Sequence, residues 1–105
     1  ITQGVGQATL ENIVYEGNSG QLLSASFQDY TMPRADDLPF YDVSSHPVPT
    51  TSNPLGVKGA GETGTVGAPA AVLNAIVNAL SSIGVKDIEM PATSEKVWQA
   101  LQNAA

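Results

Sequence analysis

The apolar positions of residues 68–83 follow the pattern of a helix that is apolar around most of its circumference. Polar side chains are confined to one narrow stripe, in which Asn74 and Asn78 recur four residues apart. Pro69 suits the first turn of such a helix, where its missing N–H costs no hydrogen bond, and Gly84 suits the position just beyond the end. A helix of this kind is typical of a protein interior, so the pattern predicts a buried helix over residues 68–83.

A shorter amphipathic pattern predicts a C-terminal helix over residues 94–102. Thr93 is a suitable N-cap, and Glu95 falls in the first turn, where the helix dipole favours a negative charge. The apolar face of this helix includes Trp98, which we expect to anchor a core.

Strand signals are concentrated in the first half of the chain. In residues 12–30, two β-branched or aromatic runs flank a glycine-containing turn, which predicts an antiparallel hairpin. Residues 40–48 predict a further strand, and its prolines suit an edge position. Residues 3–11 are ambiguous, because a partial helical period is opposed by Gly4 and Gly6, each of which weakens a helix by about 1 kcal/mol relative to Ala. The predicted fold class is α+β.

Composition limits the possible functions of this 105-residue chain to those of one small domain or fragment, residues 1–105. Charged residues make up 13%, against a typical quarter, which suggests that much of the surface faces other protein. A net charge of −6 argues against a nucleic-acid partner. With no cysteine and only His46 as histidine, the residues predict no metal site of their own. We also expect no secretory signal and no apolar run of membrane length.

A glycine-dense loop over residues 53–67 is the strongest candidate for a functional site. Its glycines, at positions 56, 59, 61, 64 and 67, leave the backbone free to approach a ligand, and it carries one carboxylate, Glu62. Glu62 is either a surface acid that the dipole of the following helix stabilises or a general base beside a substrate. Residues 59–64 match the letters of a dinucleotide fingerprint, but residues 51–54 read as loop and not as the strand that such a site requires.

Four stretches, taken together, resemble one known family over nearly the whole chain. They are Gln3-Gly-Val-Gly-Gln-Ala8, Asp29-Tyr-Thr-Met-Pro-Arg-Ala-Asp-Asp-Leu-Pro39, Asn53-Pro-Leu-Gly-Val-Lys-Gly-Ala-Gly-Glu-Thr-Gly-Thr-Val-Gly-Ala-Pro69 and Met90-Pro-Ala-Thr-Ser-Glu-Lys-Val-Trp98. In this order the chain resembles the C-terminal segment of the large, molybdopterin-binding subunit of the molybdenum hydroxylases, which include xanthine dehydrogenase, aldehyde oxidase and carbon monoxide dehydrogenase. The implied fold is a fragment of an α+β molybdopterin-binding domain.

The resemblance implies roles for particular residues. Glu62 would be the general base that activates a molybdenum-bound hydroxide for hydroxylation of an aldehyde, a purine or a similar electron-poor carbon. Gln3, Gly59, Ala60 and Gly61 would contact the cofactor. A base of this kind is expected to lie buried in a water-poor loop.

The resemblance also implies that this chain is incomplete alone. The molybdenum–molybdopterin cofactor would be shared with upstream polypeptide, and [2Fe–2S] clusters and FAD would lie in partner subunits or domains. The cytoplasm is the expected compartment, with the periplasm as the alternative. Two other functions stay open: a non-catalytic interaction or scaffold domain that retains this fold, and a nucleotide-binding module, which requires a strand ending immediately before Gly59.

Overall fold

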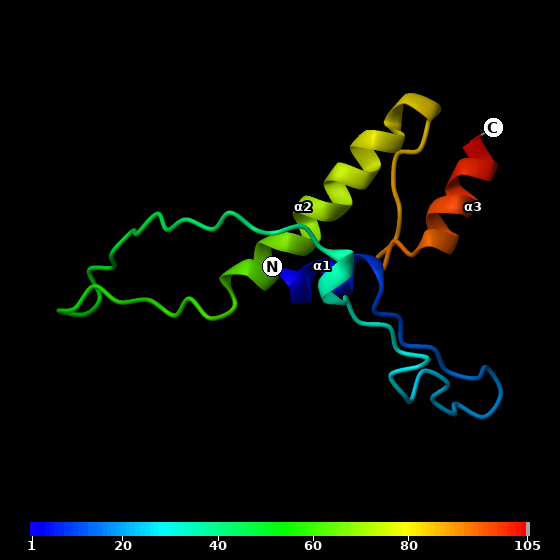
Figure 1. The fold of residues 1–105 in the computed structure, drawn as a ribbon, viewed down its shortest axis with the longest axis horizontal. Helices are drawn as coiled ribbons and strands as arrows, with labels where there is room; N and C mark the ends of the chain where they lie inside the picture. Colours follow the sequence, from blue (N-terminus) through cyan, green and yellow to red (C-terminus); the bar gives the residue numbers. More distant parts are fainter. Residues whose placement is uncertain (105) are drawn as a thin grey trace.

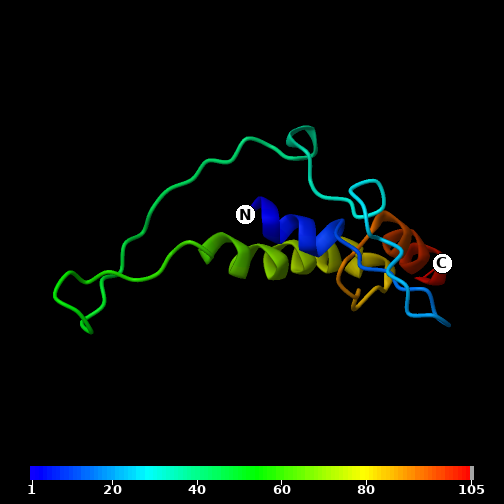
Figure 2. The same cartoon turned by 90° about the horizontal axis from the view of Figure 1, so that it is seen from below.

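A computed structural model describes residues 1–104, which contain three α-helices joined by long irregular segments (Figure 1). In chain order the elements are α1 (Thr2–Thr9), the short 3₁₀ helix η1 (Ala35–Asp37), α2 (Thr63–Leu80), the 3₁₀ helix η2 (Ser81–Ile83) and α3 (Ser94–Ala104). Two long loops project from the helices, one between α1 and η1 and the other between η1 and α2 (Figures 1 and 2).

The chain is far more open than a compact domain of its length. Its radius of gyration is 17.8 Å, whereas a compact domain of this length has a value of about 13 Å. The accessible surface is 8141 Å², against about 5,500 Å² for a folded monomer of this mass. The chain therefore leaves exposed a large surface that a self-contained domain would bury.

The helix α1 packs closely against the first turns of α2. A Cβ atom added to Gly4 would lie 2.7 Å from Cβ of Ala68 and 2.8 Å from Cδ of Pro69, so only glycine fits at this crossing. The same Cβ would lie 3.1 Å from the carbonyl oxygen of Thr65. That carbonyl is the one that Pro69, having no N–H, leaves without its usual helical donor. The helix α1 therefore covers the point where the proline interrupts the hydrogen bonding of α2.

Gly6 has a similar role on the opposite side of α1. A Cβ at this position would come within 2.7 Å of Cδ of Pro33 and 2.5 Å of a carboxylate oxygen of Glu11. These contacts explain why residues 2–9 form a helix although two glycines weaken it. Both glycines are required by close packing, and tertiary contact outweighs their low helix propensity.

The helix α2 differs from the predicted helix 68–83 in its start and in its burial. It begins at Thr63, so Pro69 lies inside the helix and not in its first turn. None of its residues is buried within the described chain, so the expected burial is wrong for this chain alone. Thr63–Ile83 is also long and apolar enough to cross a membrane by length and composition, contrary to our expectation that no such run exists.

The small core of the structure lies along the segment that leads from η2 to α3. Its buried apolar residues are Ala8, Val85, Ile88 and Ala92. The amide of Ala92 donates a hydrogen bond of 2.7 Å to the carbonyl of Ala8, which ties this segment to the end of α1. Gly84 has a φ of +93° and ends η2, as its position in the sequence suggested.

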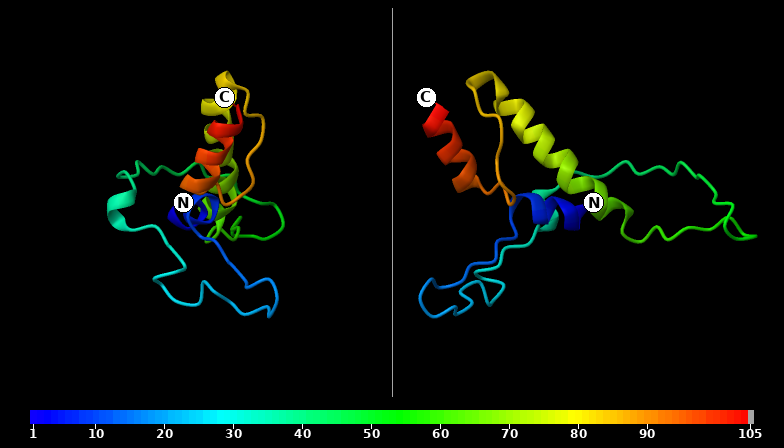
Figure 3. Two further views of the ribbon diagram at one scale, coloured as in Figure 1. Left: turned by 90° about the vertical axis from the view of Figure 1, so that its right-hand side faces the viewer. Right: turned by 180° about the vertical axis from the view of Figure 1, so that it is seen from behind.

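The helix α3 begins where the sequence predicts. The amide of Lys96 donates a hydrogen bond of 3.3 Å to the Thr93 hydroxyl, so Thr93 is the N-cap. The side chain of Trp98 is 59% exposed, so its expected core role is not met within this chain. The segment before α3 runs alongside both α2 and α3, projecting between them in the right-hand view of Figure 3 and to one side of them in the left-hand view.

The predicted hairpin over residues 12–30 contains a turn but no regular strands within the described residues. A single antiparallel bridge joins Tyr15 to Leu22. The carboxylate of Glu16 accepts hydrogen bonds from the amides of Asn18 at 3.0 Å and Ser19 at 2.6 Å, and these bonds close the turn. The predicted strand over residues 40–48 likewise has no regular strand structure in this chain.

Candidate functional site

The first half of the glycine-dense loop is held by the side chain of Asn53. Its amide oxygen accepts hydrogen bonds from the amides of Leu55 at 3.1 Å and Val57 at 3.2 Å, and its amide nitrogen donates to the carbonyl of Val57 at 3.0 Å. Gly56 within this turn has a φ of +67°, a conformation that favours glycine. One asparagine and one glycine thus give the loop a defined shape before it reaches Glu62.

Glu62 lies at the N-cap position of α2, immediately after a tight turn. The carbonyl of Ala60 accepts hydrogen bonds from Thr63, at 3.3 Å from the amide and 2.9 Å from the hydroxyl. The side chain of Glu62 makes no capping hydrogen bond and is exposed in this chain. The expectation that this carboxylate is buried is therefore wrong for the chain alone. The turn instead presents it outward at the positive end of the helix dipole.

A hollow of about 830 Å³ adjoins this turn. One side is formed by the glycine loop and the first turn of α2, including Lys58, Gly59, Ala60 and Thr63. The other side is formed by residues 43–49. The sequence pointed to the glycine loop but not to this second wall, which includes the exposed His46.

The N-terminal ends of α1 and α2 meet beside the same hollow. A Cβ added to Gly64 would lie 2.6 Å from the backbone nitrogen of Ile1, and Ile1 lines the hollow. Gln3, in the first turn of α1, is exposed close to this contact. Both helices begin on the same side, from which the long loop before α2 projects (Figure 2). Their unpaired N–H groups give it a partial positive charge that suits an anionic or strongly polar ligand.

Nothing within this chain explains the glycines at positions 59 and 61. A Cβ atom added to either would have no atom of the described chain within 4 Å, and neither has a positive φ. Gly67, inside α2, is equally open, although glycine there weakens the helix by about 1 kcal/mol. Close approach by another group, from outside these residues, is the remaining physical reason for glycine at such positions.

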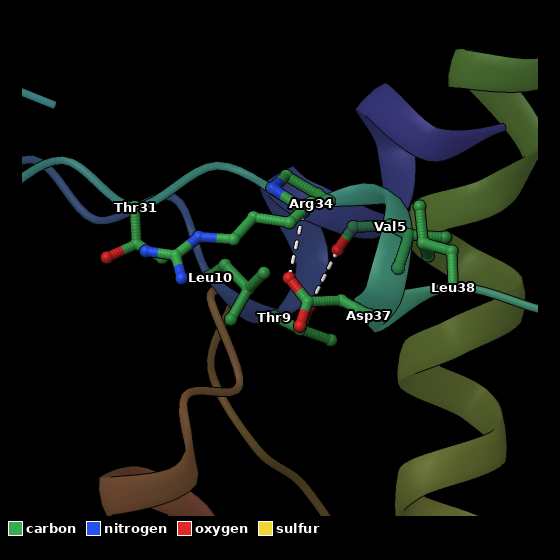
Figure 4. Close-up of a pocket in the computed structure, with 8 residues that line it drawn as sticks. Val5, Thr9, Leu10, Thr31, Arg34, Asp37 and Leu38 are labelled. Carbon is green, nitrogen blue, oxygen red and sulfur yellow. Dashed lines mark hydrogen bonds between the residues drawn. The ribbon is translucent and has the colours of Figure 1, made fainter.

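A second hollow, of about 440 Å³, lies between the end of α1 and η1 (Figure 4). The carboxylate of Asp37 accepts a hydrogen bond of 2.8 Å from the amide of Arg34, and the Arg34 side chain extends toward Thr31. Just beyond the end of α1, the Tyr30 hydroxyl donates a short hydrogen bond to the Glu11 carboxylate. This bond, aided by partial burial and by the carboxylate charge, raises the pKa of Tyr30. These contacts hold the segment before η1 against α1.

The described residues contain no cluster of three or more His, Asp or Glu side chains that could hold a metal ion. They also contain no strand that ends before Gly59, because residues 56–60 have no regular secondary structure. The second finding removes the context that a dinucleotide fingerprint needs, so the nucleotide-binding hypothesis is not supported.

The chain is similar to segments of several known proteins. The model of a molybdopterin cofactor-binding domain matches residues 1–39. The large subunit of nicotine 6-hydroxylase from Paenarthrobacter nicotinovorans is 43% identical over 100 residues, which cover 95% of this chain and 12% of the relative. The large chain of carbon monoxide dehydrogenase from Hydrogenophaga pseudoflava is 30% identical over 102 residues, covering 97% of this chain and 13% of the relative.

The fold is also similar to part of a solved structure. The crystal structure of quinoline 2-oxidoreductase from Pseudomonas putida 86 superposes with a TM-score of 0.84 at 32% identity, covering 96% of this chain and 13% of that one. The chain thus spans only about an eighth of the length of the proteins it matches. It belongs to the molybdenum hydroxylase family, as a segment of the large, molybdopterin-binding subunit.

Proposed function

We propose that this chain supplies Glu62 as the general base of a molybdenum-dependent hydroxylase or dehydrogenase. The observation that carries the proposal is the position of Glu62 at the start of α2, exposed and without a capping hydrogen bond, in a turn whose residues Ala60 and Thr63 line a hollow of about 830 Å³. A carboxylate in this position can accept a proton from a group bound in the adjoining space. Proton transfer by such a base typically contributes about 10²- to 10⁴-fold to the rate.

The residues beside Glu62 fit one wall of a site for the molybdenum–molybdopterin cofactor. The backbone at Gly59, Ala60 and Gly61 is exposed and free of side-chain obstruction, so a flat polar ligand can reach its N–H and C=O groups. The exposed amide of Gln3 offers both a donor and an acceptor from the neighbouring helix end. These four residues would hold part of the group, and the remaining contacts would come from other parts of the subunit.

When bound, the cofactor supplies the oxygen that enters the product and accepts two electrons from the substrate. The contribution of this chain is the proton transfer, in which a carboxylate oxygen of Glu62 takes the proton of the attacking hydroxyl group. The turn from Ala60 to Thr63 orients that carboxylate, and the walls of the hollow exclude water once the rest of the subunit closes over it.

The proposed substrate is a small molecule with an electron-poor carbon, such as an aldehyde, a purine or another nitrogen heterocycle. The names of the relatives support this class, because nicotine and quinoline are nitrogen heterocycles. The hollow itself has apolar residues, including Val43 and Val48, beside the possible donors His46 and Lys58. Such a lining suits an aromatic ring with polar ring atoms.

The proposed partners are the remainder of the large subunit and subunits or domains that carry [2Fe–2S] clusters and FAD. One face of α2, with Gly67, Ala71, Ala75 and Ala79, is exposed, and these small residues permit close approach of another element. We propose that polypeptide of the same subunit covers this face, that the face does not contact lipid, and that the enzyme is cytoplasmic.

The alternative function is that of a non-catalytic scaffold domain. In that case a substitution of Glu62 would have no effect on turnover.

Metal analysis combined with native mass spectrometry of the complex that contains this chain tests the proposed class. The proposal requires molybdenum together with larger partner chains, and a metal-free monomer would favour the scaffold alternative. The role of Glu62 is tested separately by Glu62→Gln in the assembled enzyme. Turnover within tenfold of the wild type would show that Glu62 is not the base.

A further inference from the structure

We infer that residues 40–46 form a β-strand whose partner is a sheet edge in the remainder of the same large-subunit polypeptide. In this chain the segment follows an extended path from η1 to the hollow beside α2 (Figures 1 and 2). Leu38, two residues before this segment at the end of η1, already has extended backbone angles, with φ −125° and ψ 142°. The path is that of a strand, but no second strand lies beside it within residues 1–104.

The backbone of this segment has no partners in the described part of the chain. Residues 39–49 take part in no backbone–backbone hydrogen bond there, and the next such bond joins the amide of Thr50 to the carbonyl of Gly56. Backbone N–H and C=O groups are strong hydrogen-bonding groups, and an extended run that leaves a whole row of them unpaired readily pairs with another strand.

The side chains of the segment favour a strand of limited length. Phe40, Tyr41 and Val43 are of the types that suit a pleated sheet, and residues 40–46 contain no glycine or proline. Pro39 and Pro47 flank the run, as expected for residues that end a ladder of hydrogen bonds. The seven residues span about 23 Å, an ordinary strand length.

The two faces of the proposed strand have different surroundings. Side chains alternate between faces along a strand, which places Tyr41 and Val43 on one face and Phe40 on the other. The Tyr41 hydroxyl lies 3.5 Å from the hydroxyl of Thr2, and Val43 lines the hollow together with Ile1. Phe40 is 101% exposed. One face therefore contacts the start of α1 through Tyr41, although Val43 on that face is 70% exposed. The other face and the strand edges are open to a partner.

The length of the relatives identifies this partner as the rest of the same polypeptide. The chain corresponds to 13% of quinoline 2-oxidoreductase and keeps the fold of that portion at a TM-score of 0.84. The same shape is therefore found inside a protein about eight times as long. The accessible surface of 8141 Å² exceeds that of a compact monomer by roughly 2,600 Å², which is surface that such additional polypeptide can cover.

Strand pairing at this place would fix the geometry of the hollow. Residues 43–46 belong both to the proposed strand and to the wall that faces Gly59 and Ala60. Without a partner, that wall is anchored only at the segment ends and at its contacts with α1. A paired strand would hold the wall at a constant distance from the loop that carries Glu62.

Hydrogen exchange of the wild-type full-length subunit tests the inference directly. Paired amides in residues 40–46 should exchange at least about 100-fold more slowly than in an unstructured peptide. Exchange of all these amides within about threefold of the unstructured rate would overturn the inference.

A photoreactive side chain placed at position 44 then identifies the partner of the strand. The cross-linking is carried out on a mixture of subunits labelled with light and with heavy nitrogen. Cross-links within one isotope support the same polypeptide, and mixed-isotope cross-links indicate a second copy and overturn the assignment.

Proline substitution provides a second, independent readout in the same full-length protein. Asp42→Pro and Val43→Pro each remove one N–H, and these two groups point to opposite edges of a strand. We expect at least one variant to lose assembled subunit by tenfold or more, whereas Val43→Ala, which keeps the N–H, retains it. Wild-type yield for both proline variants would contradict strand pairing.

Discussion

The close approach of Gly4 to Ala68 holds the first turns of α1 and α2 together. A Cβ atom on Gly4 would lie 2.7 Å from Cβ of Ala68, so the backbones of α1 and α2 approach as closely as only glycine allows. This crossing brings the first turn of α1, which contains Gln3, to the part of the structure where α2 begins after Glu62. A residue pair with no chemical role thus determines how the proposed cofactor contact and the proposed base are arranged.

The first prediction concerns this crossing. Gly4→Ala should destabilise the contact of α1 with α2 by about 1–3 kcal/mol, because the added methyl group meets a well-packed helix and the ring of Pro69. Faster hydrogen exchange of α1 in the full-length subunit would report the loss. Gly17→Ala is the matched control, since no atom lies within 4 Å of its added Cβ. Equal exchange of α1 in the two variants would show that the crossing is not tightly packed.

The second prediction uses an open glycine to detect the missing polypeptide. Gly67→Ala should stabilise α2 by about 1 kcal/mol if the helix surface stays open, because alanine is the better helix former. If other polypeptide packs against this position, as we propose, the sign reverses and the yield of assembled subunit falls. Thermal unfolding of the subunit carrying Gly67→Ala measures the sign. A raised Tm would contradict close packing at Gly67.

The third prediction concerns the cap of α3. Thr93→Ala should cost about 1 kcal/mol because it removes the acceptor for the Lys96 amide. The first turn of α3 would then exchange its amide hydrogens about fivefold faster. Ser94→Ala is the control, since the Ser94 hydroxyl makes no hydrogen bond among the described residues. Unchanged exchange in Thr93→Ala would mean that packing alone sets the start of α3.

The fourth prediction is a pH dependence of the turn at Glu16. Hydrogen bonds from Ser19, and then from Asn18, lower the pKa of Glu16 below its ordinary value of 4.5. Because the folded pKa is the lower one, the stabilisation of the turn is present above pH 4.5 and is lost as the pH falls through the folded pKa. Protection of the Ser19 amide should therefore decline in acid below pH 4.5. Protection that is the same for Glu16→Gln and wild type across this range would refute the role of the charge.

The sequence predicted the presence of the helices over residues 68–83 and 94–102 better than it predicted where α2 begins or how exposed the helices are. The apolar run after residue 68 and the Thr93 cap are readable because they depend on neighbours along the chain. The start of α2 at Thr63 and the helical state of residues 2–9 are less readable from the sequence, because Gly64 and Gly4 oppose a helix locally. Both glycines are explained by close packing between the N-terminal segment and α2, in which Gly4 meets Ala68 and Gly64 meets Ile1.

In the candidate site, too, local sequence features could be recognised, whereas features that depend on distant parts of the chain could not. Glu62 was recognisable from its glycine-rich setting, whereas the second wall of the hollow, residues 43–49, has no local signal of function. Its position depends on a loop that returns to α2 over a long distance in sequence (Figure 2). The expected burial of Glu62 and of residues 68–83 is not present in the chain alone. We propose that polypeptide beyond these residues supplies it.

Single-turnover reduction of the molybdenum-containing enzyme by its substrate tests most directly whether Glu62 is the proton acceptor. This measurement isolates the chemical step from product release and from electron transfer to the partner subunits. Glu89→Gln, at an exposed glutamate outside the hollow, is the matched control. We predict that Glu62→Gln lowers the rate of reduction about 10²- to 10⁴-fold with unchanged molybdenum content. A rate within tenfold of wild type, at equal molybdenum content, would contradict the account.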